Sequence, residues 1–423
     1  MGERFDFEEN YLKILNAEMI PAMGCTEPIA IAFASAKLRD VLGEVPDEMT
    51  AFCSGNIIKN VKSVEVPNAG GLKGVEAAAI LGAVAGKAEL ELEVISQVTD
   101  AEKEKVKELY EKHVCRCELE VGEENLYVKI EGKKRSETGS VTIQGAHNHI
   151  AQITKNNEVL FEQASVSPQD KGDKTQLNIH DILEFAKTVP YEKIKPLMER
   201  QIAMNSAISQ EGMKNPWGAQ VGQTLYEMEG SSLKNKMKAA AAAGSDARMS
   251  GCCLPVVINS GSGNQGITVS VPVIVYAREK GKSEEELCRA LAVSNLISLH
   301  QKRYIGNLSA YCGAVSAGTA AACGIAWLDG AGYDTIGKII VNALGTVGGI
   351  VCDGAKASCA AKIASSVEAG IFAYEMAQNG RVFAFGDGLV EKDYEQTIRN
   401  IGRMGREGMK STDEEILHIM IGQ

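Results

Sequence analysis

The sequence predicts a mainly helical protein, in which both ends of the chain form one helical domain and a small α/β domain is inserted between them. Helical periodicity fills residues 7–43 and returns from residue 179 to the end, while alternating polar and apolar residues occupy the stretch between them. The chain has 423 residues and is 45% hydrophobic, so two domains are expected. The predicted boundaries are 1–88 and 173–423 for the helical domain and 89–172 for the insert.

The first helical stretch is interrupted near Pro21. In the segment MGCTEP, Thr26 is the expected N-cap of the helix that follows, with Pro28 in its first turn. Residues 74–88 are rich in alanine and predict a further helix.

The pattern changes at residue 89, where ELELEVIS alternates as a strand does. A helix is expected at 100–113, and residues 165–178 predict a polar linker. One helix on an antiparallel sheet is therefore the expected form of the insert. The other segments that predict strands are CRCELEV, NLYVKIEG, SVTIQGAHNHIAQI and EVLFEQ.

The charge and hydropathy of the chain argue against nucleic acid and membranes as partners. The net charge is −11, with 55 acidic and 44 basic residues, which leaves no basic surface for nucleic acid. No run of 18 apolar residues predicts a membrane span, and the charged start MGERFDFEEN is unlike a signal peptide. We expect a cytoplasmic protein that binds no nucleic acid or membrane, and a homodimer, since enzymes of this size with a helical core are often dimers.

Eleven cysteines are many for a cytoplasmic chain, where disulfides are rare. Burial, metal binding and catalysis remain as explanations for them. We expect Cys115 and Cys117 to be structural. The cysteines predicted to be ordinary core residues are Cys53, Cys252, Cys253, Cys288 and Cys323.

Cys312, Cys352 and Cys359 are candidate metal ligands in glycine-rich surroundings. Three thiolates suit a [4Fe–4S] cluster, and three ligands instead of four leave one iron open for Lewis-acid chemistry. Spacing alone also permits three core cysteines. Zinc is the competing metal, although structural zinc favours four ligands at tight C-x-x-C spacing, which these three cysteines lack.

Cys25 precedes a predicted helix, where the helix dipole is expected to lower the pKa of its thiol. The residue is then a candidate nucleophile or base, the alternative being a packed cysteine beside a turn.

Two polar segments are candidate substrate sites. In the glycine-rich segment 259–266, backbone N–H groups with Ser260, Ser262, Asn264 and Gln265 can bind a carboxylate or a phosphate, although a plain turn is equally compatible. Asn56 and Asn60, one helical turn apart with Lys59 between them, can face one ligand. We expect His147 and His149 to lie on a polar surface or at a domain contact.

Taken together, these segments resemble the L-cysteine desulfidase family, which is related to the iron–sulfur-dependent L-serine dehydratases. The resemblance spans nearly the whole chain and includes MGCTEP, SGNIIKN, NSGSGNQG, LSAYCGAVSAGTAAACG and GGIVCDGAKASCAAKI, in that order. It implies a [4Fe–4S] cluster on Cys312, Cys352 and Cys359, no pyridoxal phosphate, and a functional role for Cys25. Val257-Ile258-Asn259-Ser260 replaces the T-A-P-T segment typical of the serine dehydratases, which disfavours serine as the main substrate.

The helical domain is then the catalytic one, and the predicted reaction converts L-cysteine and water to pyruvate, ammonia and hydrogen sulfide. Cys25 is the candidate base, and Thr26 with the two polar segments would hold the substrate. Three alternatives remain. They are an iron–sulfur L-serine dehydratase, a non-catalytic cluster protein that senses oxygen or cysteine, and a pyridoxal phosphate enzyme with a lysine such as Lys356 as its Schiff base.

Overall fold

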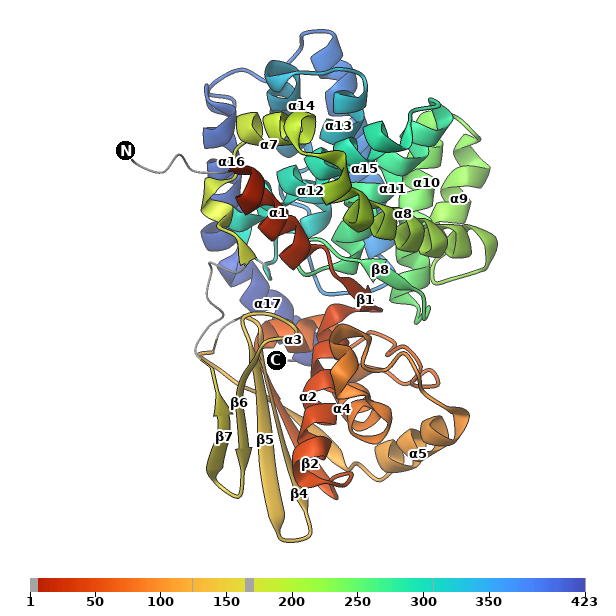
Figure 1. Cartoon of the computed structure of the whole chain (residues 1–423), viewed down its shortest axis with the longest axis vertical. Helices are drawn as coiled ribbons and strands as arrows, with labels where there is room; N and C mark the ends of the chain where they lie inside the picture. Colours follow the sequence, from red (N-terminus) through yellow and green to blue (C-terminus); the bar gives the residue numbers. More distant parts are fainter. Residues whose placement is uncertain (1–6, 124, 164–170, 307, 423) are drawn as a thin grey trace.

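The computed structural model describes residues 7–123, 125–163, 171–306 and 308–422. A helical lobe lies above an α/β lobe along the long axis of the molecule (Figure 1). This arrangement confirms the predicted fold class, mainly helical with a small α/β part. The predicted linker falls partly on residues 164–170, outside the described residues.

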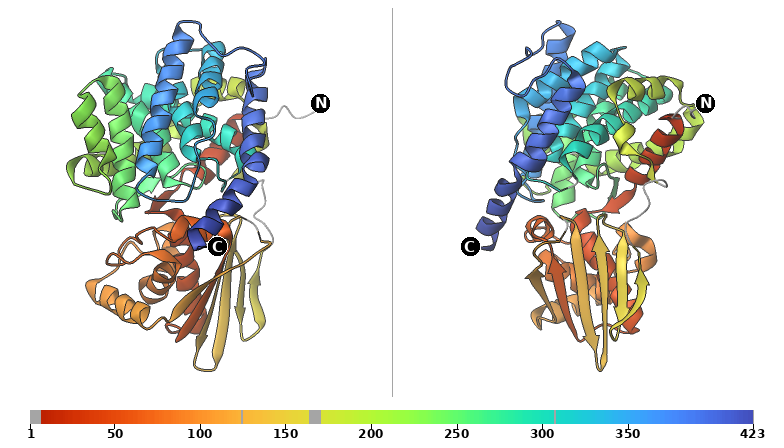
Figure 2. Two further views of the ribbon diagram at one scale, coloured as in Figure 1. Left: turned by 180° about the vertical axis from the view of Figure 1, so that it is seen from behind. Right: turned by 90° about the vertical axis from the view of Figure 1, so that its left-hand side faces the viewer.

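The helical lobe combines α1 with the helices that follow residue 173, and the last of these, α17, extends from the lobe to pack against residues 55–61 of the α/β lobe (Figures 1 and 2). Helix α13 forms its centre, where it is buried along almost its whole length and packs against α11, α12, α14 and α15. The elements are α1 (Phe7–Glu18), η2 (Lys174–Gln176), α7 (Ile179–Thr188), α8 (Tyr191–Lys214), α9 (Val221–Glu229), α10 (Leu233–Met249), α11 (Gly263–Glu279), α12 (Glu284–Ile305), α13 (Gly313–Leu328), α14 (Tyr333–Val347), α15 (Cys359–Gln378), α16 (Tyr394–Arg403), η3 (Met404–Gly408) and α17 (Lys410–Ile421).

The α/β lobe is a six-stranded sheet with helices on one face. Its strand order is β3-β2-β4-β5-β6-β7, and only β2 and β3 run parallel among the described pairs. The elements are α2 (Thr26–Leu42), β2 (Glu48–Cys53), α3 (Gly55–Val61), α4 (Gly74–Ala85), η1 (Ala88–Glu93), α5 (Asp100–Glu111), β3 (Cys115–Leu119), β4 (Tyr127–Lys134), β5 (Glu137–Gln144), β6 (Ile150–Lys155) and β7 (Glu158–Glu162).

The sheet differs from the predicted one in two respects. It includes β2, which precedes residue 89, and the β2–β3 pair is parallel because the chain returns to β2 through α3, α4 and α5. Residues 89–96 do not form the predicted strand. Residues 89–93 belong to η1, in which Leu92 is buried against neighbouring elements, and residues 94–96 form a turn. A short alternating run is compatible with a strand or with a short helix. Packing against α2 and residues 21–23 selects the helix here.

The first 88 residues were predicted to belong to the helical domain, but they are shared between the two lobes. Helices α2 and α4 lie with the α/β lobe, and Leu38 of α2 packs over Gly132 and Gly139 of the sheet. Apolar periodicity shows that a helix has a buried face, but it does not identify what covers that face. The short strands β1 (Pro21–Met23) and β8 (Pro255–Val257) pair antiparallel and connect the entry to α2 with the helical lobe.

Among the described residues, no helix is long and apolar enough to cross a membrane.

The contact between α2 and α4 requires a glycine. A Cβ atom at Gly82 would lie 2.1 Å from the carbonyl oxygen of Ala32. We therefore predict that Gly82→Ala lowers the free energy of unfolding by about 1–3 kcal/mol, because the two helices must separate. Thermal unfolding followed by circular dichroism measures the effect. Gly408→Ala is the control, since its Cβ would meet only Met404, at 3.8 Å. Equal Tm values for Gly82→Ala and the wild type would contradict the packing.

Candidate active site

A small cavity of about 100 Å³ lies where the two lobes meet. The α/β lobe contributes the start of α2, helix α3 and the β5–β6 loop, and the helical lobe contributes the ends of several helices. The cavity brings together every predicted site residue except Thr26. Those lining it are Cys25, Asn56, Lys59, Asn60, Ser260, Ser262, Asn264, Gln265, Cys312, Cys352 and Cys359.

Cys312 and Cys352 are placed side by side by an antiparallel bridge between Tyr311 and Val351. The amide of Cys312 donates to the carbonyl of Ile350 at 2.9 Å, and the amide of Cys352 donates to the carbonyl of Ala310 at 2.7 Å. Cys312 is the N-cap of α13, and Cys359 is the first residue of α15. Backbone pairing thus directs two thiols from distant parts of the sequence into one cavity, and the start of α15 adds the third.

The loop that carries Cys352 lies directly against α3. Gly354 has a φ of +94°, and a Cβ there would lie 2.3 Å from the carbonyl oxygen of Lys59. Only glycine combines that backbone conformation with so close an approach. The close contact fixes α3, and with it Asn56, Lys59 and Asn60, relative to the cysteine-bearing loop.

The three thiols differ in their electrostatic surroundings. The pKa of Cys352 is lowered to about 6, chiefly by its hydrogen bond with Cys312 and then by the charges of Lys59 and Lys362, against the effect of burial. The pKa of Cys312 is raised by the same hydrogen bond and by burial, and burial raises that of Cys359. A cation bound among them favours all three thiolates.

The donor set suits an iron–sulfur cluster better than a single ion. Within the described part of the chain, no three His, Cys, Asp or Glu side chains are arranged to hold one metal ion. A four-iron cluster is much larger than one ion, so its thiolate ligands stand around a cavity and not at a point. Three thiols lining one cavity, with basic side chains beside them, fit such a group.

Cys25 lies beside this group of thiols. It belongs to a small buried cluster with Val64 and Met249, against which Ala355 and Cys359 pack. The structure corrects the predicted capping, because Cys25, not Thr26, is the N-cap of α2. The hydroxyl of Thr26 instead donates to the carbonyl of Gly261 at 2.9 Å and so connects α2 to the polar segment 259–266.

The predicted lowering of the Cys25 pKa is wrong. Burial and the neighbouring carboxylate of Glu27 raise the pKa of this thiol, and they outweigh its position at a helix start. The thiol donates to Glu27 Oε2 at 2.9 Å, and that carboxylate also accepts from Asn60 Nδ2 at 3.0 Å. At neutral pH, Cys25 is therefore a protonated thiol whose proton points at a carboxylate.

Glu27 is the acceptor at the centre of this network. Burial acts to raise its pKa, but the charge of His147 and the hydrogen bond from Cys25 lower it below the ordinary value. The carboxylate is 7% exposed, and His147 Nε2 lies 3.9 Å from its Oε1. Glu27 is thus an ionised carboxylate held in a buried site.

The polar segment 259–266 is more helical than expected. Helix α11 begins at Gly263, and the side chain of Ser262 caps it by accepting from the amide of Gln265 at 3.5 Å. Asn264 and Gln265 therefore lie in the first turn of α11. Their side-chain amide oxygens are buried without hydrogen-bond partners, and both side chains line the cavity. A helix N-terminus with polar side chains suits a carboxylate.

On α3, Asn56 and Asn60 lie one turn apart, as predicted, and each retains a buried oxygen without a partner. Lys59 is already paired. Its ammonium contacts Asp413 of α17 and donates to the carbonyl of Cys352 at 3.4 Å. Lys59 therefore stabilises the cysteine-bearing loop and is not free to neutralise a substrate.

Several residues that line the cavity were not predicted as site residues from the sequence. Glu27 belongs to the segment MGCTEP and Tyr311 to LSAYCGAVSAGTAAACG. His147 lies at the contact between the lobes, one of the two locations predicted for it. Arg248 and Lys302 had no motif around them. An arginine within the small-residue helix AAAAAGSDARM was the available signal, because a charge in so apolar a segment requires a buried partner.

The remaining cysteines largely follow the prediction. Cys53, Cys252, Cys288 and Cys323 are buried. Cys253 is exposed, because it follows the end of α10 in a surface loop, where its thiol donates to Asn68 Oδ1 at 2.9 Å. Cys115 and Cys117 lie on β3 of the sheet.

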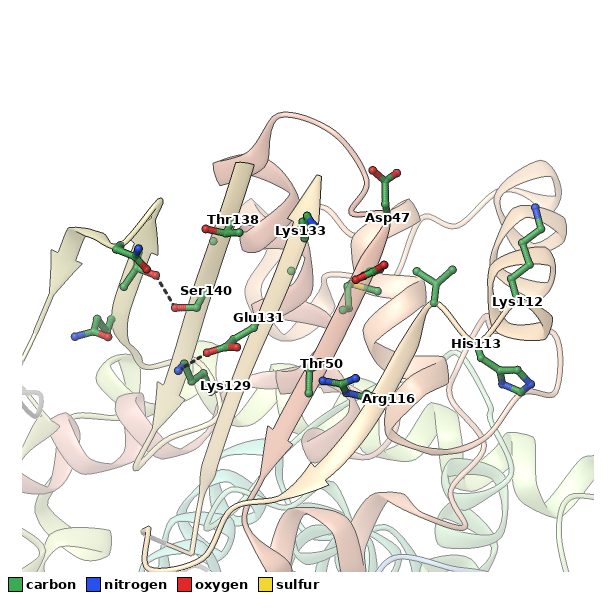
Figure 3. A pocket seen from close by; sticks show the side chains of 18 residues that line it. Asp47, Thr50, Lys112, His113, Arg116, Lys129, Glu131, Lys133, Thr138 and Ser140 are labelled. Atoms are coloured by element: carbon green, nitrogen blue, oxygen red, sulfur yellow. Dashed lines mark hydrogen bonds and ion pairs between the residues drawn. The ribbon is translucent and has the colours of Figure 1, made fainter. Parts of the chain in front are cut away.

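A larger hollow of about 1010 Å³ lies on the sheet face away from α2 and α4. Figure 3 shows its side chains spread along neighbouring strands without converging on one point. Several pair with one another, as Lys129 does with Glu131 at 2.5 Å and Ser140 with Thr154 at 2.7 Å. These are the outward residues of a half-buried sheet, so size does not identify this hollow as the reactive site.

Comparison with known proteins identifies the family of this chain. The model of the family described as serine dehydratase alpha chain matches residues 89–418. The chain belongs to this family, which is of the iron–sulfur type. A protein of Desulfitobacterium hafniense is 50% identical over 100% of this chain and 99% of its own length. One of Finegoldia magna is 49% identical over 98% of this chain and 99% of its own. Both are named UPF0597 protein, a name that states no activity.

The first prediction for this site concerns the thiols. Cys352→Ala is expected to lower the iron bound per chain at least severalfold after anaerobic reconstitution, because one of three thiolate ligands is lost. Iron and acid-labile sulfide analysis measures the loss. Cys323→Ala is the matched control, since Cys323 is a buried cysteine of α13 away from the cavity, and it should retain its iron. Full iron content in Cys352→Ala would exclude this residue as a ligand.

The second prediction concerns Cys25. Glu27→Gln removes the negative charge that raises the pKa of this thiol, so more thiolate forms at a given pH. Alkylation of Cys25 by iodoacetamide near pH 8 should become about tenfold faster if the pKa falls by one unit. Mass spectrometry of the Cys25 peptide measures the rate, and Glu48→Gln, at an exposed position on β2, should leave it unchanged. An unchanged rate in Glu27→Gln would show that burial alone sets the pKa.

Proposed function

We propose that the protein is an L-cysteine desulfidase that converts L-cysteine and water to pyruvate, ammonia and hydrogen sulfide. The supporting observation is that Cys25 and its carboxylate partner share one small cavity with Cys312, Cys352 and Cys359. Membership of an iron–sulfur dehydratase family supports elimination from a small amino acid.

Cys312, Cys352 and Cys359 would hold a [4Fe–4S] cluster. With three protein ligands, such a cluster supplies an open iron that acts as a Lewis acid toward the leaving sulfur.

The chain's own residues would move the Cα proton. Because Cys25 is a neutral thiol hydrogen-bonded to Glu27, we propose a relay in which the sulfur of Cys25 accepts the Cα proton as its own proton passes to the carboxylate. The proton count balances, and Glu27 holds the proton at the end of the step. The electron pair of the Cα–H bond forms the double bond as sulfide leaves, and the aminoacrylate product then tautomerises and hydrolyses.

The polar side chains of the cavity would hold the substrate. The N-terminus of α11 is surrounded by the polar side chains of Ser260, Ser262, Asn264 and Gln265. On α3, Asn56 and Asn60 offer side-chain amide oxygens to an ammonium group. A cavity of about 100 Å³ favours a small amino acid over a large one. Thr26 acts indirectly, through its hydrogen bond to Gly261.

An iron–sulfur L-serine dehydratase is the second candidate, because the matching family is described as serine dehydratase alpha chain. The same cavity would serve, with hydroxide as the leaving group. A cluster-based sensor of oxygen or cysteine would need neither Cys25 nor its hydrogen bond to Glu27. A pyridoxal phosphate enzyme is disfavoured, since Lys356 pairs with Asp353 at 2.9 Å and is not among the described residues that line the cavity.

Cytoplasmic location and a homodimer remain part of the proposal. The acidic net charge of −11 accords with a soluble protein that binds no nucleic acid.

The test is anaerobic purification, analysis of iron and sulfide, and assay with both amino acids. We expect bound iron, and a kcat/KM for L-cysteine at least tenfold above that for L-serine. A preference for L-serine would support the dehydratase instead. Bound iron without turnover of either amino acid would support the sensor, and protein that binds no iron under these conditions would contradict the proposal.

A further inference from the structure

Three buried cations line the cavity, namely Lys59, Arg248 and Lys302, exposed by 3%, 3% and 4%. Lys59 is paired with Asp413. Burial lowers the pKa of Lys302 to about 8, and the charges of Cys352 and Cys312 act against this lowering. Lys302 therefore stands beside these two cysteines. Arg248 is the remaining positive charge of the cavity.

Arg248 has no hydrogen bond or ion pair to any residue that the structure describes, and its buried Nε has no partner. Burying a guanidinium without an anion is unfavourable, so such a group is retained where a ligand completes it. Glu27 is the carboxylate whose pKa the charge of Arg248 lowers, but its oxygens already accept from Cys25 and Asn60. The free donors of Arg248 are therefore available to something that enters the cavity.

The guanidinium lies at the start of α11. A Cβ at Gly263, the first residue of that helix, would lie 2.2 Å from Nε and 2.7 Å from Cζ of Arg248. The partial positive charge of a helix N-terminus and a full positive charge thus meet at one wall of the cavity, beside Asn264 and Gln265. A planar carboxylate matches the parallel donors of a guanidinium.

We infer that Arg248, with the first turn of α11, binds the α-carboxylate of the substrate and restricts the enzyme to amino acids with a free carboxylate. This inference rests on the proposed elimination. It sets an orientation in which the carboxylate lies at Arg248, Cα lies near Cys25, and the leaving group points toward Cys312, Cys352 and Cys359. Pairing the carboxylate with Arg248 also makes the Cα proton easier to remove. The negative charge that develops on Cα then lies next to a carboxylate whose own charge is balanced.

The competing role for Arg248 is to balance the charge of the cluster thiolates, since its charge also lowers the pKa of Cys359. The two roles differ in which ligands they affect. A carboxylate-binding arginine discriminates between ligands with and without a carboxylate, whereas a charge-balancing one changes the cluster itself.

The experiment measures binding of two small thiols to anaerobic holoenzyme by isothermal titration calorimetry. 3-Mercaptopropionate carries the carboxylate without the amine, and cysteamine carries the amine without the carboxylate. Arg248→Gln should weaken 3-mercaptopropionate binding by about 10- to 100-fold, as expected for loss of a charged hydrogen-bonded pair, and change cysteamine binding less than about threefold. The matched control is Arg278→Gln, at an exposed position near the end of α11.

A second variant keeps the charge and moves it. Gly263→Ala displaces the guanidinium through its new methyl group, so it should also weaken 3-mercaptopropionate and spare cysteamine, even if Arg248→Gln does not fold. Equal weakening of both thiols, or unchanged binding with altered cluster absorption, would overturn the inference in favour of charge balance. The proposed function fails separately, if wild-type holoenzyme releases no sulfide from L-cysteine.

Discussion

The antiparallel bridge between Tyr311 and Val351 is the contact on which the site depends. Its hydrogen bonds, from the amides of Cys312 and Cys352, place two thiols together that lie forty residues apart in the sequence. The close approach of Gly354 to the backbone of Lys59 then fixes α3 against the same loop. Because α3 belongs to the α/β lobe, this contact also determines how the two lobes enclose the cavity.

Charge is divided within the cavity in a way that suits an elimination. The positive charges of Lys59, Lys302 and Lys362 act on the thiols of Cys312 and Cys352, where thiolates require compensation. Glu27 and Cys25 share a proton-bearing hydrogen bond in the same cavity, and Arg248 faces the start of α11 without a hydrogen-bond or ion-pair partner among the described residues. An acceptor for a proton, a positive site for an anion and a thiolate group for a metal cluster therefore lie within one small volume.

Sequence patterns predicted what is local and missed what depends on packing. Helix α3 with Asn56 and Asn60 one turn apart, and strands β3, β4 and β7, follow from periodicity alone. The one predicted segment at 140–153 is divided into β5 and β6 by the loop at 145–149. The helical state of residues 88–93, the place of β2 in the sheet and the high pKa of Cys25 depend on neighbours distant in sequence. Cys25 does stand at a helix start, as expected, but burial and Glu27 reverse the effect of the helix dipole. Arg248 carries no motif, and only the cavity shows what it faces.

The central claim is that three thiols of this cavity hold a four-iron cluster with one iron left for the substrate. Mössbauer spectroscopy of anaerobic, iron-57-enriched protein, with and without L-cysteine, tests it most directly. The account predicts one iron site in four whose parameters change when L-cysteine is added, while the other three stay the same. A spectrum without a four-iron cluster, or one in which no iron site responds to L-cysteine, would contradict the account.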